Sequence, residues 1–398
     1  MGDWRDSTLG EVCDEVGGSI QTGPFGSQLH QSDYSEVGVP VVMPKDIIEG
    51  RIAHESIARV SSDHISRLSR HKLSLGDIVY GRRGDIGRQA LIRDEQVGWL
   101  CGTGCLRLSL GDSVLDPLFL HYYLRQDDVV SWITNQAVGA TMPNLNTGIL
   151  RSVPVRFPQL NTQKRIAGIL SAYDELIENS QRRIKILESM ARALYREWFV
   201  HFRFPGHDSV PRVPSPLGEI PQGWEVRVVE EIVKRIPVGK KYDQKTVSPT
   251  GTVPVFDQGK SGVIGYHDDV PGVFASEVAP VIVFANHTCY QRLIHSPFSA
   301  IQNVLPFVPS PISPRNVYWL HHATNGLVVF NDYKGHWPEF ATKSLIVPPA
   351  GLANRFGDFA EPLERQRLRL ERQIHTLRRT RDLLLPRLLS GQIDVEAV

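Results

Sequence analysis

Residues 161–202, NTQKRIAGILSAYDELIENSQRRIKILESMARALYREWFVHF, decide the architecture of the chain. The stretch has no proline and no glycine after Gly168, and its apolar residues recur at the spacing of an amphipathic helix. One seam along it alternates steps of four and three, the heptad pattern of a coiled coil, and consists of Tyr173, Ile177, Ser180, Ile184, Leu187, Ala191, Leu194 and Trp198. Such a seam needs a partner helix to bury it.

A second stretch with the same apolar register begins 190 positions later, where Ile184 pairs with Ile374 and Leu194 with Leu384. We therefore predict that the two helices pack as an antiparallel coiled coil. The alternative is two separate helices, each covering its own domain. The predicted contact residues, against the other helix or a protein partner, are Ile177, Ile184, Leu187, Leu194, Trp198, Phe199, Leu363, Leu370, Ile374, Leu377 and Leu384.

Each helix follows a stretch of short apolar runs broken by glycine and proline, which predicts an α+β domain. A proline-rich segment separates the two halves and favours an extended connector. The predicted fold class is α+β, a pseudo-twofold tandem repeat of two domains with two long helices. Its parts are a first domain at 1–160, a helix at 161–202, a linker at 203–222, a second domain at 223–350 and a helix at 351–398.

The bulk composition limits the class of protein. A chain of 398 residues with 41% apolar and 22% charged residues is typical of two or three globular domains. It has no apolar run of the ~20 residues that a membrane helix needs, and its first residues lack a secretory pattern. The four cysteines are few and scattered, so we expect reduced thiols and a cytoplasmic protein. With a net charge of +1, any nucleic-acid binding must use local basic patches.

Several segments, in their order along the chain, resemble the specificity subunits of type I restriction-modification systems. The helix entry at 163–199 is similar to the central region of that family, SPLGEIPQGWEV at 215–226 to the lead-in of its second domain, and LLLPRLLSGQIDV at 383–395 to its C-terminal signature. Within the first half, TGPFGSQL, YGRRGDIGR and GATMPNLN also resemble family positions. The resemblance covers nearly the whole chain.

The resemblance implies that two target-recognition domains each read one half of a bipartite site in double-stranded DNA. It also implies two modification (methyltransferase) subunits and ATP-dependent restriction subunits as partners, with no membrane involved. S-adenosylmethionine, ATP and Mg would belong to those partner subunits, and no cofactor to this chain. A helix of about 37 residues is roughly 55 Å long, enough to separate two reading modules by a turn of duplex or more.

Candidate DNA contacts lie in loops rich in arginine, asparagine and lysine. Arginine pairs with guanine or phosphate, and asparagine with adenine. The alternatives are a solvated basic turn for the arginines and structural corners for the segments before each helix. The candidates are Arg82, Arg83 and Arg88, then Thr141, Asn144 and Asn146, then Tyr290, Gln291 and Arg292, and finally Lys334, His336 and Trp337.

No motif in the sequence predicts catalysis. The run GTGCLR at 102–107 lacks the third glycine of a dinucleotide loop, and Cys101 and Cys105 have no second Cys/His pair at zinc-finger spacing. We find no Walker A, methyltransferase or nuclease pattern, so the chain is predicted to be a noncatalytic targeting subunit. A coiled-coil scaffold that binds only proteins and an enzyme with an unrecognised site are the alternatives.

Overall fold

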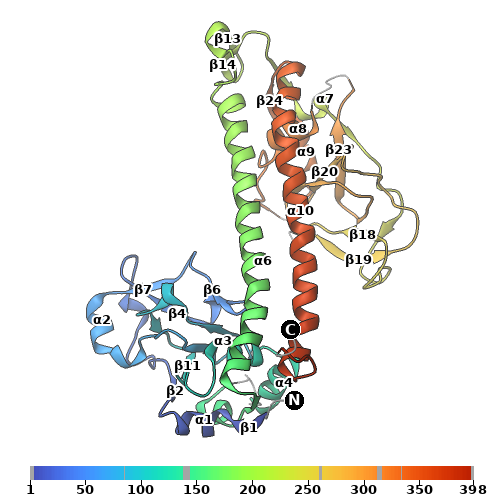
Figure 1. Ribbon diagram of the computed structural model, residues 1–398. Coiled ribbons are helices and arrows are strands. Elements are labelled where there is room, and N and C mark those ends of the chain that lie inside the picture. The colour runs from blue at the N-terminus through green and yellow to red at the C-terminus, as the bar shows by residue number, and fades with distance from the viewer. Residues whose placement is uncertain are drawn as a thin grey trace. The chain divides into compact units, whose positions relative to one another are not determined.

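The computed structural model describes residues 4–84, 86–137, 144–259, 262–311, 316–332 and 334–395. The chain forms two compact units, and each is described by itself. Unit 1 comprises Met1–Glu178 with Ile374–Val398, and unit 2 comprises Asn179–Gln373. The division falls inside both long helices, so each helix gives one segment to each unit (Figure 1).

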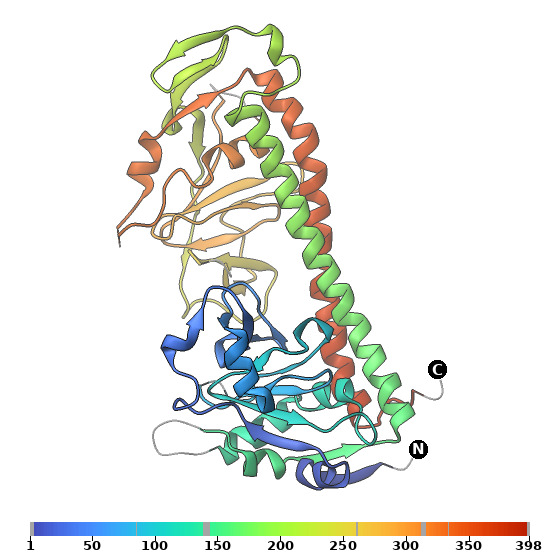
Figure 2. The ribbon, with the colours of Figure 1, turned by 90° about the vertical axis from the view of Figure 1, so that its left-hand side faces the viewer.

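The two long helices are α6 (Leu160–Tyr195), which ends in a π-helical turn at Arg196–Val200, and α10 (Ala350–Leu389). In unit 1 the start of α6 lies beside the end of α10, and in unit 2 the end of α6 lies beside the start of α10 (Figures 1 and 2). The pairing is antiparallel in each unit, and the predicted fold class is confirmed.

The predicted seam lies on the covered side of both helices. Ile177, Leu187, Trp198, Phe199, Leu370 and Ile374 are all less than a tenth exposed, while Ile184, Leu194, Leu363, Leu377 and Leu384 are half-buried. The polar seam residue Ser180 is buried as well. The aromatic end of α6 packs on α10, because the ring centroid of Phe199 lies 5.3 Å from that of Phe356.

Unit 1 holds two four-stranded sheets. The first has the order β2-β11-β8-β9 and is antiparallel, and the second has the order β10-β4-β7-β3 with β10 and β4 parallel. The strands are β1 (Arg5–Thr8), β2 (Ser19–Thr22), β3 (Tyr34–Ser35), β4 (Val39–Val42), β5 (Ile47–Ile48), β6 (Arg51–Ile52), β7 (Ala58–Val60), β8 (Ile78–Gly81), β9 (Gln89–Leu91), β10 (Leu100–Cys101), β11 (Cys105–Ser109) and β12 (Pro154–Phe157). The helices are α1 (Leu9–Glu15), α2 (Ser62–Arg67), α3 (Pro117–Tyr123), α4 (Asp127–Gln136) and α5 (Thr147–Arg151).

Local sequence explains several of these elements. β8 is buried along its whole length, as expected for an apolar run with neighbours on both sides. α1 begins with a capping box, in which Glu11 N–H donates to Thr8 Oγ1 and Thr8 N–H donates to the Glu11 carboxylate. α3 begins with Asp116 as N-cap and Pro117 in its first turn.

Unit 2 repeats the plan of unit 1. One sheet has the order β16-β23-β20-β21 and is antiparallel, and the other has the order β17-β22-β18-β19 with β18 and β22 parallel. The strands are β13 (Arg212–Ser215), β14 (Gly218–Pro221), β15 (Glu225–Val228), β16 (Val233–Arg235), β17 (Lys241–Tyr242), β18 (Val253–Phe256), β19 (Val263–His267), β20 (Val281–Ala285), β21 (Gln291–Ile294), β22 (Ser299–Ile301), β23 (Val304–Pro309) and β24 (Ser344–Val347). The helices are α7 (Val229–Ile232), α8 (Val317–Thr324) and α9 (Trp337–Thr342).

The repeat extends to individual buried side chains. In unit 1 the Gln89 side chain, at the start of β9, donates to the carbonyl of His121 on α3 at 2.8 Å. In unit 2 the Gln291 side chain, at the start of β21, donates to the carbonyl of His321 on α8 at the same distance. The outer strand pairs also correspond, since β1 pairs with β12 and β15 with β24. The two units are therefore built on one plan.

The proline-rich segment differs from the extended connector that its composition favours. It forms the β13–β14 hairpin, whose strands pair from Arg212↔Pro221 to Ser215↔Gly218. A two-stranded hairpin accommodates proline because each strand has one unpaired edge. Phe204, Ile220 and Trp224 around it are buried in the core of unit 2, so the segment is part of that unit.

Candidate nucleic-acid interface

In unit 1 the structure brings together three segments that are far apart in sequence. The turn after β8 meets the turn before β11, because Arg82 N–H donates to Gly104 O at 2.8 Å. It also meets the chain before α5, because Leu145 N–H donates to Arg82 O at 2.9 Å and Arg83 forms a bridge with Asn144. We call Arg82–Arg83, Gly104 and Asn144–Asn146 the unit 1 loop cluster.

The predicted glycine turn between β8 and β9 is present. Gly84 and Gly87 have φ angles of +83° and +101°, which residues with a Cβ rarely adopt. Arg83 and Arg88 are exposed beside this turn, whereas Arg82 is half-buried and its Nε donates to Leu145 O at 3.2 Å. Arg83 is thus the arginine of the cluster that is best placed for a ligand, and Arg82 holds two of its loops together.

The two asparagines of this cluster differ in availability. Asn144 is exposed, but the side-chain oxygen of Asn146 accepts the Ile149 N–H at 2.9 Å and caps α5. An amide whose oxygen caps a helix cannot offer both its oxygen and its NH2 group to adenine. For Asn146 the alternative therefore applies, in which the residue forms a structural corner before the helix. The candidate Thr141 lies outside the described residues.

The structure adds one basic residue that the sequence interpretation missed. Lys45 is exposed on the 3-10 turn Pro44–Asp46, which leads away from β4. The neighbouring Pro44 lies against both turns of the cluster, since a Cβ on Gly81 or on Gly104 would lie 3.4 Å from it. Sequence spacing does not predict that Lys45 lies near the loop cluster, because the packing of the two sheets of unit 1 brings them together.

Unit 2 has a loop cluster with the same backbone connections. Asn286 follows β20 as Arg82 follows β8, and its N–H donates to Asn303 O at 2.9 Å. His336 N–H donates to Asn286 O at 2.8 Å, which repeats the bond from Leu145 to Arg82. We call Asn286–His287, Asn303 and Lys334–Trp337 the unit 2 loop cluster.

His287 connects the segments of the unit 2 loop cluster, and the candidate list omits it. One ring nitrogen lies 2.9 Å from Lys334 O, and the other lies 2.9 Å from the side-chain nitrogen of Asn303. Its backbone N–H donates to the Gln258 side chain at 2.8 Å. The polar run after β20 was the available sequence signal, but the contacts with Gln258 and Asn303 depend on the fold.

Two candidates of unit 2 are corrected. His336 is fully buried, and its backbone rather than its side chain connects the loops. Gln291 is 6% exposed, donates to His321 and accepts the Thr324 hydroxyl at 3.0 Å. Both side chains are used inside the unit, so we remove them from the candidate DNA contacts.

The remaining unit 2 candidates lie in two places. Lys334 is exposed in the loop cluster, and Trp337 is half-buried there with the Arg235 guanidinium 4.8 Å from the centre of its ring. Tyr290 and Arg292 lie elsewhere, beside a cavity of this unit. Burial lowers the pKa of Arg292, whose guanidinium lies 4.9 Å from the Tyr290 ring.

Within their own units, the long helices carry large apolar side chains that are only partly covered. On α6, Leu176, Ile186 and Met190 are each about half exposed, and on α10 Phe359 and Leu383 are more than half exposed. We call these residues the outer helix face. Uncovered apolar side chains of this size on a helix mark candidate sites of protein contact.

The described residues give no indication of a metal site or a membrane span. Across the described residues, no three His, Cys, Asp or Glu side chains lie together as metal ligands would, and no helix has the length and apolarity to cross a bilayer. Cys101 and Cys105 lie buried on β10 and β11 as free thiols.

Comparison with known proteins finds one family that this chain resembles. Residues 1–189 match the model described as "Type I restriction modification DNA specificity domain". The first half of the chain is therefore similar to the DNA specificity domain of type I restriction-modification systems.

Individual proteins of that family are similar to this chain. The type I restriction enzyme MjaIX specificity subunit of Methanocaldococcus jannaschii is 23% identical over 99% of this chain and 94% of its own length. The HindI specificity subunit of Haemophilus influenzae is 20% identical over 51% of this chain and 42% of its own. The crystal structure of a type I system S subunit from M. genitalium has the same fold, with a TM-score of 0.60, 17% identity, and 97% of this chain and 96% of that chain covered.

Proposed function

We propose that this chain is the noncatalytic subunit that gives a type I restriction-modification complex its DNA sequence specificity. Unit 1 reads one half of a bipartite site and unit 2 reads the other. The observation that carries the proposal is the repeated loop cluster, in which one backbone arrangement presents Arg83 and Asn144 in unit 1, with Lys45 nearby, but Lys334 in unit 2. Different side chains on the same frame favour two different half-sites.

The proposed assignment of roles follows from side-chain chemistry. Arg83 is suited to bidentate pairing with guanine, and Asn144 to pairing with adenine. Lys45 and Lys334 carry a compact charge on a flexible stem, which suits phosphate contacts that position the protein. This local basic surface is how a chain with a net charge of only +1 would bind DNA.

The long helices have two roles in this proposal. They set the gap between the half-sites, because α6 and α10 each contribute a segment to both units. They also dock two modification subunits through the outer helix face, where Ile186, Met190 and Phe359 are about half exposed. The modification subunits would bring S-adenosylmethionine, and the restriction subunits ATP and Mg.

The test is to co-express this chain with the modification subunit of its own system and map methylated bases in the host DNA. The proposal expects a split motif with a constant gap, absent when this chain is omitted. Insertion of seven residues, two helical turns, into both α6 and α10 should preserve the coiled-coil register and lengthen the gap. Methylation that is unchanged without this chain would favour the protein-only scaffold.

A further inference from the structure

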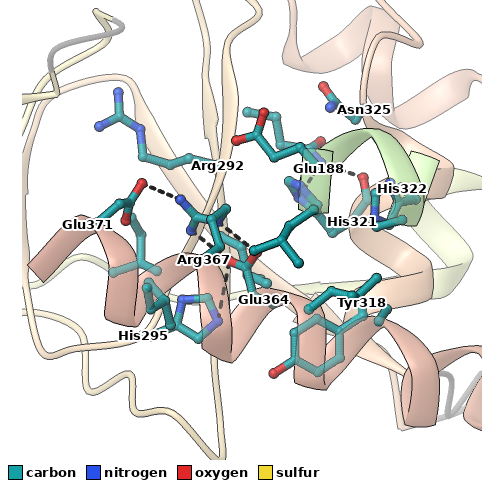
Figure 3. Close-up of a pocket in the computed structure, with 18 of the residues that line it drawn as sticks. Glu188, Arg292, His295, Tyr318, His321, His322, Asn325, Glu364, Arg367 and Glu371 are labelled. Atoms are coloured by element: carbon teal, nitrogen blue, oxygen red, sulfur yellow. Dashed lines mark hydrogen bonds and ion pairs between the residues drawn. The ribbon is translucent and has the colours of Figure 1, made fainter. Parts of the chain in front are cut away.

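The segment at 325–332 joins α8 to the unit 2 loop cluster and begins at the edge of a cavity. That cavity, of about 670 Å³, lies between β21, α8 and the parts of α6 and α10 in this unit, with Asn325 at its edge (Figure 3). In the cavity Arg367 donates to Glu364 and Glu371, and no described residue of the lining belongs to the loop cluster. These charges are used inside the unit, so it is the segment that leads to the proposed DNA surface.

Two neighbouring apolar side chains of this segment face solvent. Leu327 packs against the core of unit 2, and Val328 is only 4% exposed. The next two residues, Val329 and Phe330, are 73% and 53% exposed. We call Val329 and Phe330 the apolar pair. Single exposed apolar residues are common, but adjacent large ones next to a proposed interface indicate a contact surface.

The buried ring of His336 holds Phe330 beside the loop cluster. The two ring centroids lie 6.1 Å apart at an interplanar angle of 65°, an edge-to-face contact. His336 Nε2 lies 3.1 Å from the carbonyl oxygen of Asp332, which also accepts the Lys334 N–H at 2.9 Å. The His336 backbone N–H donates to Asn286 O. A side chain fixed in this way loses little conformational freedom when it binds a partner.

Unit 1 has no counterpart of the apolar pair at this place in the fold. Its α4 lies between α3 and the unit 1 loop cluster, and Val129 and Ile133 of α4 are buried in the core of that unit. Among the described residues between α8 and α9, unit 2 has no helix. The shared fold therefore does not require exposed apolar residues here, which favours a role specific to unit 2.

Thymine is the standard base that an apolar side chain recognises from the major groove. Every base pair presents hydrogen-bonding groups there, but only thymine adds a methyl group. Contact between that methyl and an apolar side chain removes both from water and favours binding. Lys334, exposed in the same loop cluster, suits a phosphate contact. The apolar pair thus lies beside a residue that would hold the DNA backbone.

We propose that Phe330 contacts the 5-methyl group of a thymine in the half-site that unit 2 reads, with Val329 beside it on the same base edge. The inference rests on the proposed function and adds a specificity-determining residue to it. Continuity of the apolar pair with the loop cluster favours DNA over a protein as its partner. The unit 2 half-site therefore contains a thymine at a fixed position.

The test uses the full-length chain in complex with the modification subunit and duplexes that carry the mapped motif. The unit 2 half-site is the half that Arg83→Ala leaves unchanged. Each of its thymines is replaced in turn by deoxyuridine, which lacks only the methyl group. At one position this change should weaken binding about 4- to 10-fold, measured by fluorescence anisotropy. In Phe330→Ala the penalty at that position should fall below about twofold, as in a double-mutant cycle.

Three further variants serve as controls. Phe274→Ala removes a ring that is 71% exposed on the loop before β20, at the opposite end of that strand from Asn286, and should keep the wild-type affinity and penalty. Phe330→Leu retains apolar surface and should keep most of the penalty. Phe330→Gln keeps the length of the side chain without its apolar surface and should behave as Phe330→Ala does.

Three results would overturn this inference while the proposed function stands. One is a deoxyuridine penalty that persists in Phe330→Ala and Phe330→Gln, and another is a unit 2 half-site in which no thymine responds. The third is loss of complex mass in Phe330→Ala with an unchanged penalty in the complex that remains, which would assign the apolar pair to a protein contact. Absence of any split motif would overturn the proposed function and this inference together.

Discussion

The loop clusters of units 1 and 2 have the same backbone frame and different side chains. Arg82 in unit 1 and Asn286 in unit 2 occupy corresponding positions. Each residue connects its own loop to two other loops by main-chain hydrogen bonds. The exposed positions carry Arg83 and Asn144 in one unit and Lys334 in the other. A frame held by backbone bonds lets the exposed residues change without loss of fold, which is what two half-sites of different sequence require.

The largest expected effect concerns the buried polar network that attaches the domain of unit 1 to its helices. In unit 1 the buried Asp174 accepts the Tyr122 hydroxyl at 2.8 Å and pairs with Arg381. Asp174→Ala leaves that arginine and Arg125 without their shared carboxylate. We expect unit 1 to lose about 3–5 kcal/mol, measured by urea unfolding.

The control is Glu175→Ala on the exposed side of α6, which should cost less than about 1 kcal/mol. Hydrogen exchange assigns each loss to a unit. Equal losses in both units after Asp174→Ala would contradict the assignment of this network to unit 1.

The next largest effect tests which residues of unit 1 contact DNA bases and which contact phosphates. Arg83→Ala should weaken binding of the assembled complex to its site by about 1–3 kcal/mol and relax one half of the methylated motif only. Lys45→Ala should instead weaken binding to every sequence and reduce the slope of log K against log salt by about 1. Fluorescence anisotropy at several salt concentrations distinguishes them, and identical behaviour of the two variants would contradict these roles.

A smaller effect tests the hydrogen bonds that hold the unit 2 loop cluster together. Asn286→Ala removes the side-chain oxygen that accepts the Trp337 N–H at 2.8 Å, while the backbone bonds of Asn286 remain. We expect a loss of about 1–2 kcal/mol in the stability of unit 2 and altered methylation at the other half of the motif. Asn331→Ala, at an exposed position, is the matched control and should change neither. A change in the half that Arg83→Ala affects would refute the assignment.

The smallest effect per residue concerns acid. Burial lowers the pKa of His321 to about 4 and that of His322 to about 3, and it also lowers that of His295. These rings are neutral in the folded state, so below the unfolded pKa of 6.5 the unfolded state binds more protons and unit 2 loses stability. Each histidine should cost about 1 kcal/mol between pH 7.5 and 5.5.

Urea unfolding at the two pH values measures this loss. His322→Gln should reduce the difference between them, whereas the same substitution at the exposed His375 should not. A pH-independent stability of unit 2 would show that these rings titrate in the folded state as they do in the unfolded chain.

The sequence predicts the fold better than the site, for physical reasons. The seam from Tyr173 to Trp198 predicts α6 because helical periodicity is local, and the repeated register predicts its partner α10. The hairpin at 212–221 was missed because its prolines argue against strands, although a two-stranded edge tolerates them.

The candidate site was harder to predict because its parts meet only after folding. Arg83 and Asn144 were correctly expected near the surface, but their bridge depends on sheet geometry. His336 is polar in sequence and fully buried in the structure, and Lys45 was overlooked because a separate sheet carries it to the loop cluster. Composition identifies residues that are able to touch DNA, and burial then decides which of them can.

We propose that each unit reads its own half of one DNA site. The most direct test is to replace residues 4–157, the part of unit 1 before the long helix, with the corresponding segment of a relative, and to map methylated bases in cells that also express the modification subunit. We expect one half of the motif to change while the other half and the gap stay the same. A motif that changes in both halves, or in neither, would contradict it.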